Sequence, residues 1–167
     1  MKKTKARNPK WEDAYKIRDW ENYISNDFNN ESQLCDFIEL NKEEFAREIL
    51  EIEYLSHVRE YYVKGKRRFK DKNTARVDFL FTSTSGENIL VECKNPKNVY
   101  CDLRNGLIQL MAYYCDTKKS GIKVDRLVLL TTKFDIVIQE IIAEYKLNVE
   151  VIVFSKQHSM RLCIINN

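Results

Sequence analysis

Two apolar segments separated by a short turn constrain the fold of this chain more than any other feature of its sequence. Residues 76–81 (RVDFLF) and 88–94 (NILVECK) are rich in β-branched and aromatic side chains, and both are predicted to be strands. The residues between them, TSTSGE, contain Ser85-Gly86, a pair typical of tight turns. We therefore expect the two segments to form an antiparallel hairpin.

Three charged residues interrupt these otherwise apolar strands: Asp78 in the first, and Glu92 and Lys94 in the second. Because side chains alternate along a strand, Glu92 and Lys94 share one face and Cys93 occupies the other. If the hairpin loop has an odd number of residues centred on Ser85, Asp78 lies opposite Glu92, with Cβ atoms about 5 Å apart. A two-residue turn would instead shift the register by one and place Asp78 on the other face.

In the odd-loop register, the two acids and the amine form a set suited to metal-assisted hydrolysis of a phosphodiester. Two carboxylates at this separation repel unless a proton or a cation lies between them, and hard oxygen ligands are those that Mg²⁺ favours. The ammonium group of Lys94 would stabilise a pentavalent phosphate or orient an attacking water. The alternative is a surface ion pair on a half-exposed strand.

The rest of the chain shows alternating helical and strand patterns. Asn29-Asn30 offers a cap for a helix with Leu34 and Ile38 on one face, and the helical pattern continues after a break near Asn41. The order α, β, β, β, α, β, α, β predicts an α/β protein with a mixed sheet covered by helices. The further expected elements are a short helix or pair of turns over residues 11–28, strands over 56–63, 126–131 and 149–154, and helices over 100–116 and 135–147. In the last helix, the side chains expected to face inward are Ile138, Ile141, Ile142 and Tyr145.

Length and composition predict a single globular domain. Of the 167 residues, 44% are hydrophobic and 32% are charged, so the chain can bury a core beneath a strongly charged surface. We expect a basic arm over residues 1–10 and one domain over 11–167. The five cysteines form no C-x-x-C pair, which favours reduced thiols over a zinc or iron–sulfur site. Without a long apolar run or a secretory signal, the protein is expected to be soluble and intracellular (cytoplasmic), with no membrane partner.

The basic residues are clustered, although the net charge is only +3. Residues 1–10 contain five cationic residues and no acid, and residues 64–76 contain seven against Asp71. Clustered cations are expected of a surface that binds the phosphate backbone of a nucleic acid, and a solvated loop and tail is the alternative. The second cluster consists of Lys64, Lys66, Arg67, Arg68, Lys70, Lys72 and Arg76.

The helix expected over residues 100–116 carries two polar side chains of interest. At 100° per residue, a core stripe through Leu103, Leu107 and Leu110 leaves Gln109 and Tyr113 off the buried face. This i, i+4 pair could hydrogen-bond a phosphate or the lysine, or could belong to an ordinary solvated face.

The run VDFLF…GENILVECK, followed by a helix containing Q-L-M-A-Y, resembles the PD-(D/E)xK nuclease superfamily. It is similar in particular to the branch with a Q-x-x-x-Y helix, which includes RecB-type nuclease domains, lambda exonuclease and EndoMS/NucS-like mismatch endonucleases. The resemblance covers roughly residues 31–154. It implies a restriction-endonuclease-like fold, in which helices flank a mixed central β-sheet.

The resemblance also implies an activity and a role for each residue of the hairpin. Asp78 and Glu92 would be metal ligands, the carbonyl of Cys93 a third ligand, and Lys94 the catalytic lysine. The implied enzyme is a Mg²⁺- or Mn²⁺-dependent deoxyribonuclease. In it a metal-activated water attacks the phosphorus in line and leaves 5′-phosphate and 3′-hydroxyl ends.

Two helices are implied to complete the site. Gln109 and Tyr113 would position the site or the DNA strand being cut. The first core helix often contributes a glutamate in this family, and Glu31, in an E-x-x-L arrangement with Leu34, is our candidate. The alternatives are Glu39, Glu48 and Glu60.

The sequence departs from the family pattern at Val77, where a proline often precedes the aspartate. We expect no separate specificity domain, so the choice of DNA target would come from the basic segments or from a homodimer. An RNA endonuclease on the same fold and a non-catalytic nucleic-acid-binding module are the two alternative functions. His57, near Arg59, is interpreted as a structural residue in preference to a general base.

Overall fold

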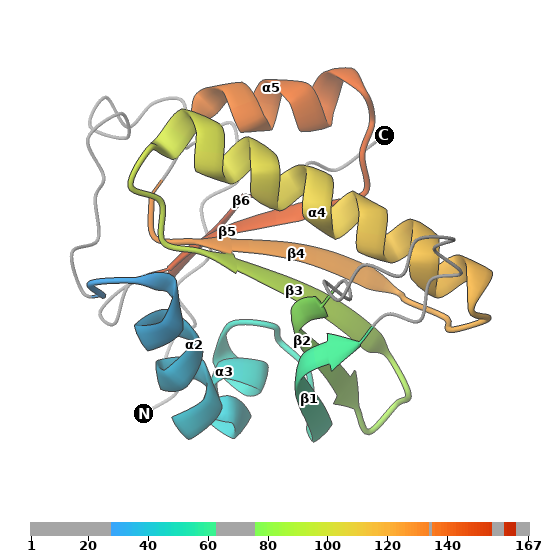
Figure 1. Cartoon of the computed structure of the whole chain (residues 1–167). Helices are drawn as coiled ribbons and strands as arrows, with labels where there is room; N and C mark the ends of the chain where they lie inside the picture. The colour runs from blue at the N-terminus through green and yellow to red at the C-terminus, as the bar shows by residue number, and fades with distance from the viewer. Residues whose placement is uncertain (1–27, 63–75, 134, 155–158, 163–167) are drawn as a thin grey trace, which may run out of the picture.

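The computed structural model describes residues 28–62, 76–133, 135–154 and 159–162, and it has the predicted α/β architecture (Figure 1). The basic arm, the segment 11–27 and residues 64–75 of the second basic cluster lie outside the described residues. The elements are α2 (Glu31–Leu40), α3 (Lys42–Glu48), β1 (Tyr54–Tyr62), β2 (Arg76–Ser83), β3 (Asn88–Lys94), α4 (Val99–Lys119), β4 (Arg126–Thr131), α5 (Ile136–Glu144), β5 (Glu150–Phe154) and β6 (Ser159–Leu162).

The described strands form one open mixed sheet, in which their order in space is their order along the chain, β1-β2-β3-β4-β5-β6. β1, β2 and β3 pair antiparallel, β3, β4 and β5 pair parallel, and β6 is antiparallel to β5. Parallel neighbours need a crossover, which α4 supplies between β3 and β4, and α5 between β4 and β5. β3 therefore belongs both to the predicted hairpin and to the parallel part of the sheet.

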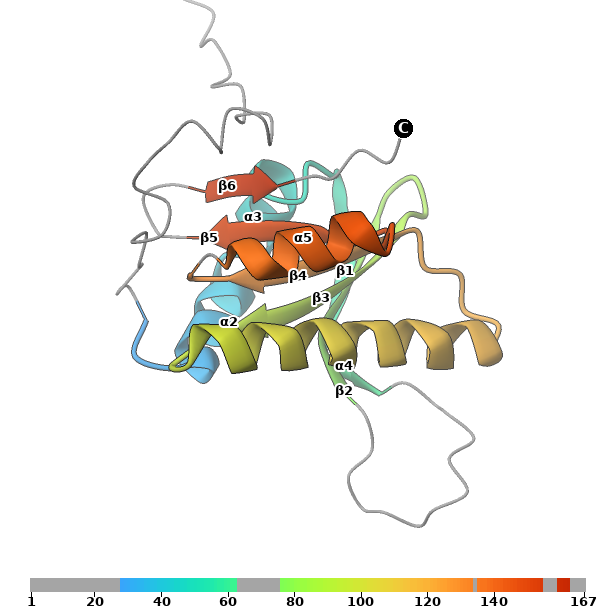
Figure 2. The ribbon, with the colours of Figure 1, turned by 90° about the horizontal axis from the view of Figure 1, so that it is seen from above.

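Helices cover both faces of the sheet, with α4 and α5 on one side and α2 and α3 on the other (Figures 1 and 2). Each face has its own apolar core, and β3 contributes to both. Its residues Val91 and Cys93 pack in the core of α2 and α3, whereas Leu90 packs in the core of α4 and α5. By the alternation of side chains, Glu92 and Lys94 lie on the α4 side. A strand covered on both faces is an expensive place for charged groups.

The hairpin between β2 and β3 has the predicted odd loop. The ladder runs in the register in which Phe79 pairs with Val91. Residues 84–87 lie between the two strands, and the Ser83 N–H donates to the Glu87 carbonyl at 2.9 Å, which leaves a three-residue loop over 84–86. Gly86 lies in the left-handed region with φ of 84°. The predicted register is confirmed from the pair Thr82–Asn88 to the pair Phe79–Val91, where the ladder ends one position before Asp78 and Glu92.

The other elements lie close to their predicted ranges. The structure adds one strand, and it differs from the prediction in the direction of one side chain. The break at Asn41 is present and divides α2 from α3. β6, a short polar strand, is not indicated by the sequence pattern. Tyr145 follows the end of α5 and is 71% exposed, so the prediction that it faces inward is wrong. In the described part of the chain, no helix combines the length and the apolar character that spanning a bilayer requires.

Gly106 allows α4 to pack closely on the end of β3. A Cβ atom at this position would lie 2.8 Å from Cγ of Lys94 and 3.1 Å from Cδ1 of Leu129. The Lys94 side chain is only 12% exposed, so it has little freedom to move away. A side chain at position 106 would therefore push α4 off the sheet or displace the lysine.

We expect Gly106→Ala to lower the free energy of unfolding by about 1–3 kcal/mol, because overpacking outweighs the roughly 1 kcal/mol by which alanine favours a helix over glycine. The matched control is Asn105→Ala at the neighbouring exposed position, which should be neutral or slightly stabilising. Urea unfolding of both variants measures the difference. A Gly106→Ala protein as stable as the wild type would contradict the close packing of α4 on Lys94.

Candidate functional site

The C-terminal end of β3 lies beside the first turns of α2 and α4, and both views show these three elements converging (Figures 1 and 2). Asn95, the residue after the strand, is held from two sides: its amide donates to the Phe28 carbonyl at 2.8 Å, and its side-chain oxygen accepts from Thr132 at 2.6 Å. Asp102, in the first turn of α4, accepts two backbone N–H groups of the loop that follows β3. These bonds fix the strand end on which the charged residues lie.

Lys94 lies between two acids at this strand end. Its Nζ donates to Oε1 of Glu92 at 2.8 Å and to Oε1 of Glu31, in the first turn of α2, at 3.4 Å. Burial disfavours the ammonium form, but the charge and the hydrogen bond of Glu92 outweigh it, and the net effect raises the pKa of Lys94 above its ordinary value. The lysine is therefore a fixed positive charge.

Glu92 is a buried carboxylate with one unsatisfied oxygen. The residue is 3% exposed, and Oε1 accepts from Lys94. Oε2 is buried and has no hydrogen-bond partner among the residues that the structure describes. Burial, followed by the charge of Asp78, raises the pKa of Glu92 to about 7 against the opposing effect of Lys94. An unpaired buried carboxylate oxygen is a costly arrangement that packing alone does not explain.

The regular alternation of side chains along β2 is interrupted at Asp78. Phe79 packs in the core of α2 and α3, but Val77, two residues earlier, packs in the core of α4 and α5. On the neighbouring strand β1, Glu60 lies between the partners of these two residues and has φ of 50°, which is uncommon for a residue other than glycine. The alternation of β2 is therefore broken at Asp78.

The carboxylate of Asp78 is directed at β3. Its Oδ2 accepts the Cys93 N–H at 2.7 Å. Burial raises the pKa of Asp78 to about 6, although this hydrogen bond and the charge of Lys94 oppose the shift. Asp78 and Glu92 thus interact electrostatically across the hairpin, as the register predicts.

The donor set fits a hard divalent cation. Three carboxylates, those of Asp78, Glu92 and Glu31, surround one ammonium group, so the ionised site carries a net negative charge. Carboxylate oxygens are the protein ligands that Mg²⁺ and Mn²⁺ prefer. A cation bound to Oε2 of Glu92 and to the Asp78 carboxylate would satisfy the unpaired oxygen and oppose the burial and the neighbouring negative charges that raise both pKa values.

The structure places Glu31, among the four glutamates considered for the first helix, next to Lys94. Its position four residues before Cys35 turns both side chains toward the sheet. The other three have different partners: Glu39 pairs with His57, Glu48 with Arg47, and Glu60 with Arg76.

The helix residues Gln109 and Tyr113 differ in position. Gln109 is exposed, as the helical pattern predicts. Tyr113 is 8% exposed and belongs to the core of α4 and α5, so the prediction that it lies off the buried face is wrong. The reason is its spacing of two turns from Gly106, which faces Lys94 and the sheet.

Arg76 is the one member of the second basic cluster that lies within the described residues. Its guanidinium pairs with Glu60 at 2.8 Å and lies 4.4 Å from the centre of the Tyr62 ring. His57 bonds Glu39 and the Tyr54 hydroxyl, at 2.9 and 2.8 Å. Its ring also stacks on a core phenylalanine, so these contacts agree with a structural role.

Two further residues near the site were not indicated by the sequence reasoning. The thiol of Cys35, on α2, lies close to the Cys93 thiol and to the Asp78 carboxylate, with their ligand atoms within 4.8 Å of one another. Arg59, on β1, pairs with Asp36 at 2.7 Å and favours the charged form of Asp78. The i, i+4 spacing of Glu31 and Cys35 is the sequence signal that could have placed Cys35 near the site.

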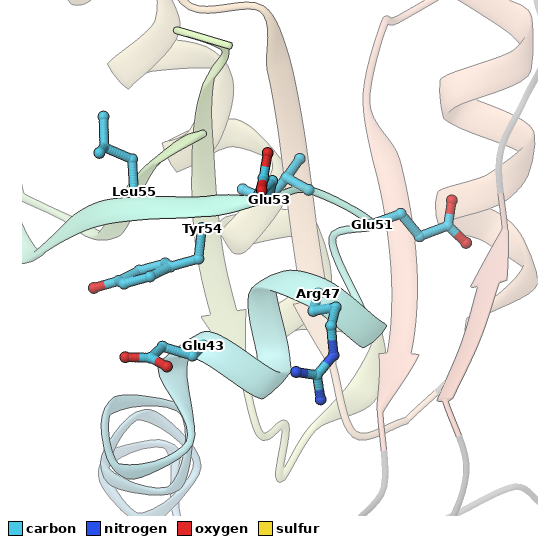
Figure 3. Close-up of a pocket in the computed structure, with 7 residues that line it drawn as sticks. Glu43, Arg47, Glu51, Glu53, Tyr54 and Leu55 are labelled. Carbon is cyan, nitrogen blue, oxygen red and sulfur yellow. The ribbon is translucent and has the colours of Figure 1, made fainter. Parts of the chain in front are cut away.

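A hollow elsewhere on the surface lies between α3 and the start of β1 (Figure 3). It contains none of the predicted site residues, and its charged side chains are mainly acidic, which does not suit a phosphate ligand. Its lining residues are Glu43, Arg47, Glu51, Ile52, Glu53, Tyr54 and Leu55.

Comparisons with known proteins return no match: no family model, no curated protein and no solved structure is significantly similar to this chain. Its fold is therefore described as an α/β fold with one open mixed sheet, and its function is inferred from the site.

The raised pKa values of the two acids determine how stability should depend on pH. Both carboxyls hold protons more tightly in the folded protein than their ordinary pKa values of 3.8 and 4.5 imply. The folded state therefore binds more protons than the unfolded state between about pH 4 and pH 7, and stability falls as the pH rises through this range.

Without divalent cations, we expect Asp78→Asn to be more stable than the wild type by about 1–3 kcal/mol at about pH 8, since one unit of pKa shift corresponds to about 1.4 kcal/mol. The amide keeps an acceptor for the Cys93 N–H but removes the charge. At about pH 4 the advantage should vanish. Urea unfolding at both pH values measures it, with the exposed Glu48→Gln as control. A less stable Asp78→Asn protein at high pH would contradict the described electrostatics.

Proposed function

We propose that this protein is a Mg²⁺- or Mn²⁺-dependent DNA nuclease of the PD-(D/E)xK superfamily, on a restriction-endonuclease-like fold. The observation that carries the proposal is the unpaired buried Oε2 of Glu92, a carboxylate whose other oxygen accepts a hydrogen bond from Lys94 and whose pKa is raised by burial and by the charge of Asp78. The mixed sheet and the position of the three residues on its central hairpin agree with this assignment.

Asp78 and Glu92 would hold the cation, with the Cys93 carbonyl as a further ligand implied by the family resemblance. When bound, the cation would supply Lewis-acid activation of a water molecule and neutralise charge on the scissile phosphate. Glu92 is held in place for this role because its Oε1 is fixed by Lys94. The hydrogen bond from the Cys93 N–H fixes Asp78 in the same way.

Lys94 would stabilise the negative charge that develops on the phosphate. Its raised pKa keeps it charged at neutral pH, and a buried, oriented ammonium is more effective in this role than a solvated one. Glu31 accepts a second, longer hydrogen bond from Lys94 at 3.4 Å, which helps to restrain the orientation of the ammonium group. Gln109, exposed on α4, is available to position the nucleic acid, whereas the buried Tyr113 is better suited to holding α4 against the sheet.

DNA is the favoured substrate because of the family resemblance and of the basic residues that precede Asp78 in the sequence. The cluster 64–76 leads directly into β2, so it could bring backbone phosphates to the site. RNA has the same backbone charge, and an RNA endonuclease is therefore the second candidate, which parallel digestion of labelled DNA and RNA would distinguish.

In the presence of Mg²⁺ or Mn²⁺, we expect the wild type to cut DNA, with chelator abolishing the activity. Lys94→Ala should lower the rate by about 100-fold or more, because it removes a charge that stabilises the transition state. Lys97→Ala, at a nearby exposed position, is the matched control and should retain activity. Agarose gels of supercoiled, linear and single-stranded circular DNA measure nicking and degradation.

Equal cutting by the wild type and Lys94→Ala would indicate a contaminating nuclease and would contradict the assignment of Lys94 as the catalytic lysine. Metal-independent DNA binding without any cutting, surviving Glu92→Ala, would favour the non-catalytic binding module.

Metal binding can be measured without a substrate. We expect Mn²⁺ to raise the melting temperature of the wild type, since a ligand that binds only the folded state stabilises it. Glu92→Gln should lose most of this shift, because the amide is a weaker ligand than the carboxylate. Glu48→Gln, an exposed acid on α3, should keep it. Differential scanning fluorimetry over a Mn²⁺ titration measures the shifts, and an equal shift in all three proteins would place the ion elsewhere.

The second basic cluster should supply affinity for DNA independently of cutting. Replacement of Lys64, Lys66, Arg67 and Arg68 by serine is expected to weaken DNA binding and to reduce the slope of log affinity against log salt by about 0.9 for each phosphate that these side chains neutralise. Replacing the exposed Lys118 and Lys119 at the end of α4 is the control. Fluorescence anisotropy at several salt concentrations measures both quantities, and an unchanged slope would show that the cluster does not bind DNA.

A further inference from the structure

We propose that Cys35, Cys93 and Asp78 form a second cation site, which takes a soft or borderline divalent ion such as Zn²⁺, and that an ion bound there withdraws Asp78 from the Mg²⁺ site. The binding part of this proposal stands on the geometry of the three side chains. The inhibitory part rests on the proposed nuclease function.

The three side chains come from three different elements and meet in the α2 side of the sheet. Their ligand atoms, two sulfurs and a carboxylate oxygen, all lie within 4.8 Å of one another. In a tetrahedral zinc site, with Zn–S distances of about 2.3 Å, two sulfurs lie about 3.8 Å apart. The observed group therefore needs a contraction of no more than about 1 Å to enclose an ion. Both cysteines are free.

The chemistry of these ligands differs from that of the Mg²⁺ site on the other side of β3. Thiolates select Zn²⁺ and Cd²⁺ over Mg²⁺, whereas the site of Glu92 offers oxygen ligands. Asp78 is common to both sets because its position at the break in β2 lets its carboxylate reach the Cys93 side of the strand. An ion held by the two thiolates would draw the Asp78 carboxylate toward Cys93 and away from Glu92, so the two sites should compete.

The bound dication would supply the charge that stabilises the two thiolates of the second site. Binding of Zn²⁺ would release one proton from each thiol to solvent, leaving two thiolates and one carboxylate around the dication, with a net charge of −1. Lys94 and Arg59 favour the charged form of Asp78, whereas burial, the Cys35 thiol and the nearby acids raise the pKa of the Cys93 thiol, so the ion itself must displace that proton. Asp78 is only partly buried, whereas Cys35 and Cys93 are 6% and 0% exposed, so an ion would enter from the side of Asp78.

The binding test uses Cd²⁺, whose bonds to thiolates give an ultraviolet charge-transfer band. The starting protein carries serine in place of Cys101, Cys115 and Cys163, so that the signal reports the two remaining cysteines. We expect the band to saturate at one Cd²⁺ per chain. Cys35→Ala in this background should reduce it by about half, because one of two thiolate ligands is removed. Asp78→Asn should keep the band and weaken the affinity.

An absent band in the background protein, or an unchanged band in Cys35→Ala, would overturn the site. Circular dichroism and the melting temperature establish that each variant is folded. Cys35→Ser, a second variant with a closer match in size, replaces Cys35→Ala if the alanine does not fold.

The inhibition test measures DNA cutting at a fixed Mg²⁺ concentration while Zn²⁺ is added. The background protein should lose activity with Zn²⁺, and Cys35→Ala should resist while cutting at the same rate without Zn²⁺. Equal inhibition of both proteins would overturn the competition between the sites. If neither protein cuts DNA under any condition, the proposed nuclease function fails, and the Cd²⁺ titration still decides whether the second site exists.

Discussion

The burial of two acids against one lysine is the constraint on which the site depends. Glu92 is almost inaccessible to solvent, lies on a strand covered on both faces, and has an oxygen that no described residue satisfies. Leaving such a group unpaired costs on the order of 1–3 kcal/mol, and a leucine like Leu90 would fill the same space without that cost. The charge of Asp78 repels the Glu92 carboxylate and disfavours its ionised form. These unsatisfied and repelling carboxylates lower the stability of the metal-free protein. A bound cation would remove both effects and stabilise the folded state, as expected of a cation-binding site.

The fold brings these groups together through three local features of the backbone. The three-residue loop sets the register of the hairpin, and the break in alternation at Asp78 turns its carboxylate toward β3. Gly106 then lets α4 cover Lys94, which removes the lysine from water without removing its acidic partners. Each feature acts on a different element, so the site is a property of the assembled sheet and helices.

The sequence predicts the parts of this site that depend on local rules. The odd loop sets the register of the hairpin, and the period of two along β3 puts Lys94 on the same face as Glu92. These rules do not predict the direction of the Asp78 carboxylate, because it depends on the break in the alternation of β2. The burial of Tyr113 is not predicted, because the angle at which a helix packs is set by contacts such as that of Gly106, which are far apart in the sequence. The approach of Cys35 to Cys93 depends in the same way on how α2 packs on the sheet. Residues 64–75, which carry most of the expected nucleic-acid contacts, lie outside the described residues, so their role is still a prediction.

Anomalous diffraction from crystals grown with Mn²⁺ would test the central claim most directly, because it locates the ion without reference to any activity. The account requires a peak bound by Oε2 of Glu92 and by the carboxylate of Asp78, with Lys94 still bonded to the other oxygen of Glu92. A map with no ion at these two carboxylates, in which Oε2 instead accepts a hydrogen bond from an ordered water or a protein group, would contradict it.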